Sequence, residues 1–326
     1  MSGPGEDGPR GGLVTLGETM GLLRAVEYGP LRHARALQLG IAGAESNVAI
    51  GVRRLGHPAT WVGRLGADDI GDLVEATLRS EGVHLCIARD SARPTGLMLK
   101  SQRTSSITKV SYYRTGSAAS AMVADELPFD RIASATVLHV TGITSALSPS
   151  CLETVNAAVD HARRHGTIVS FDVNHRNALW QEDVARPVLQ TLAARADIVF
   201  AGEDEASLLL GRDRSAPAGD LAAAISDLGA AQVVIKRGEA GAVALVEGVQ
   251  LEEPGRTVTT VDPVGAGDAF VAGYLSAFLD GGNPAQRLRT ANMTGAFAVS
   301  VSGDWEGAPT RRELDLLDHQ MGTVIR

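Results

Sequence analysis

Residues 136–171 read TVLHVTGITSALSPSCLETVNAAVDHARRHGTIVSF, in which two short apolar runs flank a helical pattern. Ser148 is a good helix N-cap, Pro149 suits the first helical position, and Gly166 suits the helix end. Between them, apolar residues recur on one helical face at Leu152, Val155, Ala158, Val159 and Ala162. The stretch therefore predicts a strand, a helix and a second strand, with the helix packed on the sheet.

The same alternation continues along the chain, with further strand-like runs at 197–200 and 232–236. Strands that alternate with helices are typical of a parallel sheet covered by helices, which predicts an α/β fold. Residues 13–40 and 95–117 instead carry strand patterns without intervening helices and predict a separate small sheet. Because no repeat or long linker divides the chain, residues 13–326 are predicted to form one domain, and the Gly-, Pro- and charge-rich residues 1–12 a disordered tail.

Composition excludes several classes of function. The chain has 326 residues, 44 % of them hydrophobic, which is enough for a large core. Its 30 Lys and Arg residues are outnumbered by 38 Asp and Glu residues without a long basic run, so no nucleic-acid partner is expected. Cys86 and Cys151 lack metal-site spacing, and no run is apolar enough for a membrane span or signal segment. These features predict a cytoplasmic protein without a membrane partner.

A glycine-rich turn is the strongest candidate for chemistry. Residues 257–268 read TVTTVDPVGAGD, which predicts a strand over 257–261, a tight turn, and a helix that has Asp268 in its first turn and ends at Gly281 and Gly282. Glycines allow a ligand to approach the backbone, and the N–H groups and dipole of a helix start attract phosphate. A carboxylate in that turn can accept the proton of an attacking hydroxyl, so the turn suits phosphoryl transfer.

Other interpretations of this turn can be compared with it. Gly-x-Gly-Asp also fits an ordinary tight connection between a strand and a helix. The phosphate-binding pattern Gly-x-x-x-x-Gly-Lys-Ser/Thr is absent from the chain. The dinucleotide pattern Gly-x-Gly-x-x-Gly fails because Phe270 stands at its third glycine, which disfavours an oxidoreductase.

Six ordered segments together resemble the PfkB (ribokinase-like) carbohydrate kinases, and among them most closely those acting on 2-keto-3-deoxygluconate. The likeness runs from about residue 13 to about residue 312, and its segments are AGAESNVAIGVRRLG (42–56), YYRTGSAA (112–119), FDVNHR (171–176), AGEDE (201–205), GAGD (265–268) and SGDWEG (302–307). The resemblance implies a Rossmann-type sheet flanked by helices, with a small β-sheet lid over the sugar. It also implies an enzyme that uses ATP and Mg²⁺.

Under this resemblance, Asp268 would be the catalytic base, and the N–H groups of Gly265, Ala266 and Gly267 would hold the charge of the transferred phosphoryl group. Glu205 would organise Mg²⁺ through water, although Gly202 stands where the family has Asn. The residues implied in nucleotide binding, besides Gly265 and Gly267, are Asn174, Lys236, Gly238, Gly241 and Asn292. Without the family, residues 237–241 read equally well as a glycine-bearing turn between two strands.

The sugar side of the site suggests the substrate. A keto acid carries a carboxylate, and Tyr113, Arg114 and Arg176 supply the hydroxyl and fork-shaped cations that bind one. Taken alone, residues 112–114 also fit an edge strand with aromatic packing and an exposed cation. The resemblance implies further sugar contacts from Gly43, Asn47, Asp268 and Asp304.

The expected reaction is ATP-dependent phosphorylation of 2-keto-3-deoxygluconate to its 6-phosphate. Met98 stands where the family often has Tyr, which leaves two alternatives open. One is a PfkB kinase for another small sugar such as fructose or ribose, and the other is a catalytically silent sugar-binding relative. Exposed apolar faces on the lid strands suggest a homo-oligomer.

Overall fold

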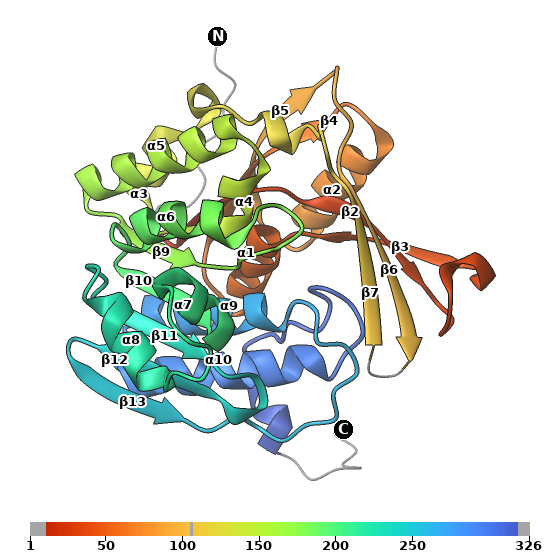
Figure 1. Cartoon of the computed structure of the whole chain (residues 1–326). Coiled ribbons are helices and arrows are strands. Elements are labelled where there is room, and N and C mark those ends of the chain that lie inside the picture. Colours follow the sequence, from red (N-terminus) through yellow and green to blue (C-terminus); the bar gives the residue numbers. More distant parts are fainter. Residues whose placement is uncertain (1–10, 105–106, 319–326) are drawn as a thin grey trace.

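The computed structural model describes residues 11–104 and 107–318 (Figure 1). Most of the predicted tail, residues 1–10, lies outside the described residues. Gly11 and Gly12 are held to the body, because Gly11 N donates to the Ser134 carbonyl at 3.0 Å and Val137 N donates to the Gly12 carbonyl at 3.0 Å. No helix among the described residues is long and apolar enough to cross a membrane.

The predicted α/β fold is confirmed by a nine-stranded sheet with the order β13-β12-β11-β10-β9-β8-β1-β4-β5. In this sheet, β11, β10, β9, β8, β1, β4 and β5 pair in parallel with their neighbours. Strands β12 and β13 extend the β11 edge in antiparallel pairing. Their bounds are β1 (Leu13–Leu16), β4 (Ala59–Gly66), β5 (His84–Asp90), β8 (Val137–Thr141), β9 (Ile168–Asp172), β10 (Ile198–Gly202), β11 (Gln232–Lys236), β12 (Ala242–Val246) and β13 (Val249–Glu253).

Helices cover both faces of this sheet, each over its own apolar core (Figure 1). One face carries α1 (Ala44–Arg54), α2 (Asp69–Ser80), α9 (Ala266–Leu279) and α10 (Pro284–Val299). The other carries α3 (Phe129–Ser134), α4 (Gly142–Leu147), α5 (Pro149–His165), α6 (Glu182–Ala193), α7 (Glu203–Leu210) and α8 (Ala218–Ser226). Short 3-10 turns occupy 31–33, 119–121, 124–126, 238–240 and 314–318.

Helix α5 forms for the reasons that its sequence predicts. The Ser148 side chain accepts a hydrogen bond from Cys151 N at 3.1 Å and so caps the helix start. Gly166 ends the helix in the left-handed conformation with φ 74°, which a residue with a side chain adopts at a cost. Val155, Ala158, Val159 and Ala162 are buried against the sheet.

A second, four-stranded sheet projects from the body in the order β3-β2-β6-β7 (Figure 1). It comprises β2 (Met20–Ala25), β3 (Leu37–Ala42), β6 (Leu97–Thr104) and β7 (Ile107–Tyr113). The predicted boundary at residue 13 is too early, because β1 is buried between β4 and β8 in the large sheet. Met98 packs in the apolar cluster of the small sheet with Met20, Leu22 and Ala42.

The strand predicted over 257–261 is wrong, since these residues belong to no sheet. Alternating Thr and Val favour a strand, but a strand needs a neighbouring edge to pair with. Here the segment runs past the end of α10, where Val261 N and Asp262 N both donate to the Val299 carbonyl, at 2.7 and 3.1 Å. The helix that follows forms as predicted and is α9.

Candidate active site

The glycine turn before α9 is shaped by its contact with the loop at Asp304. Gly265 caps the helix with φ 80°, a left-handed conformation that favours glycine. A Cβ on Gly265 would also lie 1.7 Å from the Asp304 carbonyl oxygen, so no side chain fits there. The N–H groups in the first turn have no partners within the helix. Together with the helix dipole, such N–H groups suit an anion, so the geometry is compatible with the anion-binding turn that the sequence predicts.

Asn47 joins three distant segments at this turn. From α1, its side-chain Nδ2 donates to Asp268 Oδ2 at 2.8 Å and to Asp304 Oδ2 at 2.9 Å. Gly43 precedes the same helix, and a Cβ there would lie 2.5 Å from the Glu18 carbonyl oxygen. The structure thus brings together Asn47, Asp268 and Asp304, with Gly43 one helical turn before Asn47, and the Asn47 hydrogen bond orients the Asp268 carboxylate.

The environment of Asp268 suits a general base. Burial of its carboxylate and the negative charges of Asp304 and Asp172 raise the pKa of Asp268 to about 8, with burial the largest cause. The hydrogen bond from Asn47 acts to lower this pKa. The charge of Arg176 also acts to lower it. Burial likewise raises the pKa of Asp304 to about 6. A base with a pKa close to the working pH is the most effective at accepting a proton in the transition state.

Lys236 supplies a cation beside the anion-binding turn. Its Nζ lies at 2.9 and 2.8 Å from the two carboxylate oxygens of Asp172, which ends β9. A Cβ on Gly267 would lie 3.7 Å from the same Nζ. Burial alone would lower the pKa of Lys236, but the charges of Asp172 and Glu205 outweigh it and raise the pKa, so the ammonium stays charged.

Asp172 was missed from the sequence, as was Glu18, which pairs with Arg114. Asp172 did carry a signal, because it ends a buried strand, and ligands of open parallel sheets bind at the carboxyl ends of strands. Glu18 carried none, since an isolated acid between two strands has no distinctive pattern. Its partner lies 96 positions further along the chain.

Glu205 is occupied by hydrogen bonds at the start of α7. Its Oε2 accepts from Gly202 N at 2.7 Å and its Oε1 accepts from His175 N at 3.1 Å. Within residues 11–104 and 107–318, no group of three or more His, Cys, Asp or Glu side chains could hold a metal ion. Mg²⁺ usually keeps several waters and takes other ligands from substrate phosphates, so it does not require a dedicated cluster of protein ligands.

The predicted sugar-side residues differ in their surroundings. Arg114 is not the exposed cation of an edge strand, because its side chain is only 9 % exposed and its Nη2 lies 2.5 Å from Glu18 Oε2. Its Nε is buried without a hydrogen-bond partner among the described residues. Tyr113, on the edge strand β7, is 63 % exposed, and the Arg176 side chain is 47 % exposed.

On the nucleotide side, Gly238 and Gly241 form the turn between antiparallel strands β11 and β12, with φ 55° and 91°. This confirms the glycine-bearing turn that the sequence left open. Asn174 also has a positive φ, 37°, just after β9. Asn292 Nδ2 donates to the carbonyls of Glu253 and Pro254 at 3.1 and 3.2 Å. Asn292 therefore holds the end of β13.

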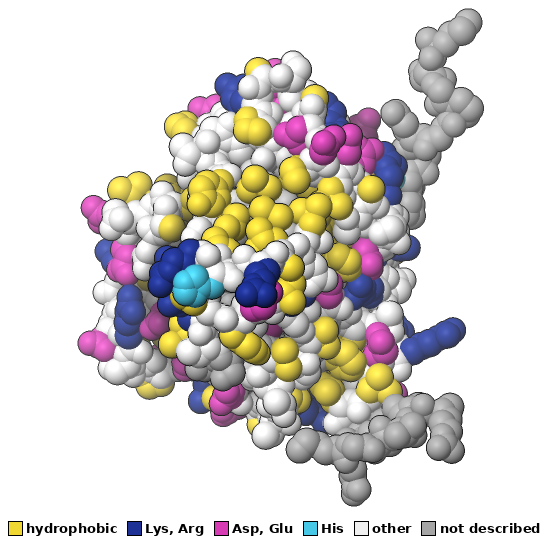
Figure 2. Space-filling model, turned by 90° about the vertical axis from the view of Figure 1, so that its right-hand side faces the viewer, with side chains coloured by type: hydrophobic (Ala, Val, Ile, Leu, Met, Phe, Trp, Pro, Cys, Tyr) yellow, Lys and Arg dark blue, Asp and Glu magenta, His cyan; other side chains and the backbone are white. Residues whose placement is uncertain are grey.

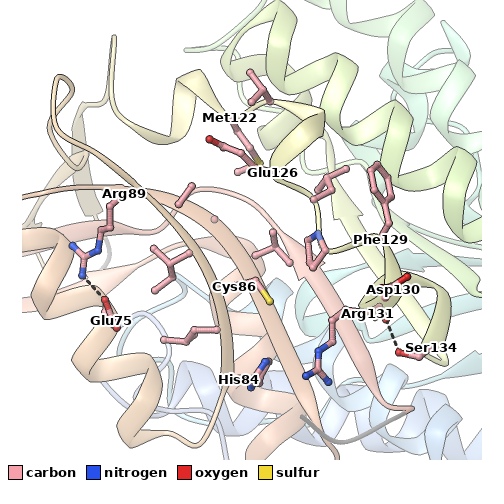
Figure 3. Close-up of a pocket in the computed structure, with 18 of the residues that line it drawn as sticks. Glu75, His84, Cys86, Arg89, Met122, Glu126, Phe129, Asp130, Arg131 and Ser134 are labelled. Carbon is pink, nitrogen blue, oxygen red and sulfur yellow. Dashed lines mark hydrogen bonds and ion pairs between the residues drawn. The ribbon is translucent and has the colours of Figure 1, made fainter. Parts of the chain in front are cut away.

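A groove of about 1430 Å³ lies elsewhere, between β5 and α3 (Figure 3). Cys86, Met122 and Phe129 line it, together with charged residues such as Glu75 and Arg89. None of the predicted site residues lines this groove. The candidate site therefore rests on the convergence at Asp268 and not on the size of a cavity.

Comparisons with known proteins show the family of the chain. The model of the pfkB family carbohydrate kinases matches residues 11–311. The chain is 37 % identical to the 2-dehydro-3-deoxygluconokinase of Bacillus subtilis, over 92 % of this chain and 93 % of that protein. It is 36 % identical to the 2-dehydro-3-deoxygalactonokinase of Haloferax volcanii, over 90 % and 92 %. The putative ribokinase II of E. coli, solved with ATP and Mg²⁺, is 25 % identical with a TM-score of 0.86, over 94 % and 99 %.

We predict that Gly265→Ala lowers kcat by roughly 100-fold, because the added Cβ forces the turn away from the Asp304 carbonyl and displaces the N–H groups. Gly281→Ala is the matched control, since Gly281 at the other end of α9 has φ 74° but nothing within 4 Å of its Cβ position. Both variants carry the dihedral strain, and only Gly265→Ala adds the clash. Equal kcat values for the two would contradict the prediction.

We predict that kcat/KM, measured at limiting nucleotide, rises with pH through the Asp268 pKa of about 8, because only the ionised carboxylate accepts a proton. Asp304→Asn removes a negative charge that raises this pKa, so it should shift the rise to lower pH. Asp280→Asn, in the exposed residue that follows α9, should leave the profile unchanged. A rise that stays in place in Asp304→Asn would refute the assignment.

Proposed function

The chain belongs to the pfkB family of carbohydrate kinases, and we propose that it transfers the terminal phosphoryl group of ATP to the 6-hydroxyl of 2-keto-3-deoxygluconate. The observation that carries the proposal is the Asp268 carboxylate, held by Asn47 at the first turn of α9. A base fixed beside the N–H groups of a helix start suits transfer of a phosphoryl group to a hydroxyl.

In the proposed reaction, Asp268 takes the proton of the primary hydroxyl as the oxygen bonds to the γ-phosphorus. The bond from that phosphorus to the bridging oxygen breaks, ADP leaves, and the proton passes from Asp268 to solvent. The N–H groups of Gly265, Ala266 and Gly267 stabilise the charge on the transferred group. Lys236 adds a fixed positive charge beside them. Mg²⁺ bound with ATP would neutralise phosphate charge, with Glu205 near it through water.

Two arginines support a substrate with a carboxylate. Glu18 holds Arg114 in place, and the Nε of Arg114 has no hydrogen-bond partner among the described residues. The positive charge of the partly exposed Arg176 acts to lower the pKa of Asp268. A fork-shaped guanidinium fixed by one carboxylate is well placed to bind another. The name of the Bacillus subtilis relative points to the same substrate.

A neutral sugar such as fructose or ribose is the second candidate. Glu18 already neutralises Arg114, which weakens its attraction for an anion. Met98 is 4 % exposed and brings no hydroxyl to the small sheet. Asn47 and Asp304 can bind the hydroxyls of any small sugar, so they do not separate the two candidates.

Two further proposals concern the setting of the reaction. Leu37, Leu39, Ile107 and Tyr112 are exposed on the small sheet, and Figure 2 shows apolar side chains gathered on that side of the molecule. Such a surface supports a homo-oligomer that pairs small sheets. A cytoplasmic location agrees with the lack of a disulfide at Cys86 and Cys151.

We predict that 2-keto-3-deoxygluconate gives the highest kcat/KM in a coupled ADP assay that also includes 2-keto-3-deoxygalactonate, fructose and ribose. Arg114→Met should lower kcat/KM for the keto acids by about 100-fold, because it removes a charged hydrogen-bond donor, and should affect the neutral sugars less. Arg103→Met, on the exposed end of β6, is the control. Turnover of fructose or ribose alone would overturn the substrate and leave the kinase assignment intact.

We predict that Asp268→Asn lowers kcat by about a thousandfold, because the amide cannot accept the hydroxyl proton. Calorimetry should show that ATP still binds, since the helix N–H groups and Lys236 remain. A near-parental kcat would rule out Asp268 as the base. Ligand binding by the parent protein without any ADP formation would instead favour the silent sugar-binding relative.

A further inference from the structure

A buried ion pair connects the small sheet to the anion-binding turn. Lys100 on β6 and Asp262 before the turn are 0 % and 1 % exposed, and Lys100 Nζ lies 2.6 Å from Asp262 Oδ2. The same ammonium donates to the Gly303 carbonyl at 3.0 Å. One lysine side chain therefore contacts both the residues that lead into the glycine turn and the loop that carries Asp304.

The Asp262 carboxylate also accepts hydrogen bonds from the backbone of both loops. Its Oδ1 accepts from Val264 N at 3.2 Å and its Oδ2 accepts from Gly303 N at 3.3 Å. Val264 immediately precedes Gly265, and Gly303 immediately precedes Asp304, whose carbonyl packs against Gly265. A shift of the Asp262 carboxylate would thus move the N–H groups of the turn.

Two more contacts join the small sheet to these loops. Gln102 lies two residues beyond Lys100, on the same face of β6, and its Nε2 donates to the Val261 carbonyl at 3.3 Å. Arg24 on β2 donates to the Ser302 hydroxyl. Both are side-chain contacts at the rim, whereas the Lys100 pair is buried and charged. Of these contacts between the small sheet and the two loops, the Lys100 pair is the buried and charged one.

The charge of Lys100 has a second consequence. Without it, the buried Asp262 carboxylate would have no ion-pair partner within residues 11–104 and 107–318, close to the turn that is proposed to receive phosphate oxygens. Removing one member of a buried pair leaves an uncompensated charge, whereas removing both does not. The Lys100 ammonium thus balances the negative charge of Asp262 beside the turn, where that charge would otherwise repel an anionic ligand.

We propose that Lys100 is a positioning residue for phosphoryl transfer, which holds the anion-binding turn in register with the small sheet through Asp262 and Gly303. This inference rests on the proposed kinase function. Lys100 touches neither sugar nor nucleotide in this account. Its effect reaches the reaction through the N–H groups at Gly265.

The test compares Lys100→Met, Asp262→Asn and the double variant with the parent, using the best sugar acceptor. We expect each single variant to lose about 100-fold in kcat, with KM for sugar and ATP changed by less than about threefold, because the turn acts mainly on charge in the transition state. The double variant should be no slower than the slower single variant, since the two residues act as a unit. Lys109→Met, in an exposed lysine of the same sheet, should retain parental kcat.

Several outcomes would overturn the inference. One is a folded Lys100→Met with kcat within about threefold of the parent, and another is single effects that multiply in the double variant. If Lys100→Met does not fold, the double variant is measured in its place, because it leaves no unpaired buried charge. We expect the double variant to show the same loss in kcat. A parental kcat in the double variant would contradict the inference. A parent without kinase activity on any sugar would contradict the proposed function instead, so the two failures are distinguishable.

Discussion

The candidate site depends on one side-chain amide that serves two carboxylates. Asn47 donates from the same nitrogen to Asp268 and to Asp304, and these partners lie 221 and 257 positions further along the chain. Two carboxylates so close together repel each other, and the shared donor offsets part of that repulsion. The amide therefore holds the base, the sugar-side loop and the first helix in one arrangement.

The rest of the site follows the same principle, since each buried acid is matched by a donor or a cation. Asp172 is paired with Lys236, Asp262 with Lys100, and Glu18 with Arg114. Glu45 is buried and accepts hydrogen bonds from the hydroxyls of Thr141 and Thr144 at 2.6 and 2.5 Å, and burial raises its pKa. Such pairs add little to net stability, because desolvation cancels much of the attraction, but they fix geometry. Rigid geometry is what a site for phosphoryl transfer requires.

Local sequence patterns predicted a helix or strand correctly where the fold also provided a surface or a neighbouring strand for it. The helix over 149–165 formed where a capping serine and a terminal glycine marked its ends, because both act within a few residues. The strand over 257–261 did not form, although its Thr and Val residues favour one, and its end is held instead by hydrogen bonds from Val261 N and Asp262 N to the Val299 carbonyl. Residues 13–16 joined the large sheet and not the small one, because they are buried between two parallel neighbours.

The sequence by itself determined the alternation of strands and helices, the glycine turn before α9 and the place of Asp268 in the first turn of that helix, because these features depend on short segments of the chain. Resemblance to a family added Asn47 and Asp304 as site residues. Only the tertiary structure decided that Glu18 holds Arg114, that Asp172 holds Lys236, and that Lys100 reaches Asp262 from another sheet. These pairs join residues 64 to 162 positions apart, and a charge shows its partner only when folding removes both from water.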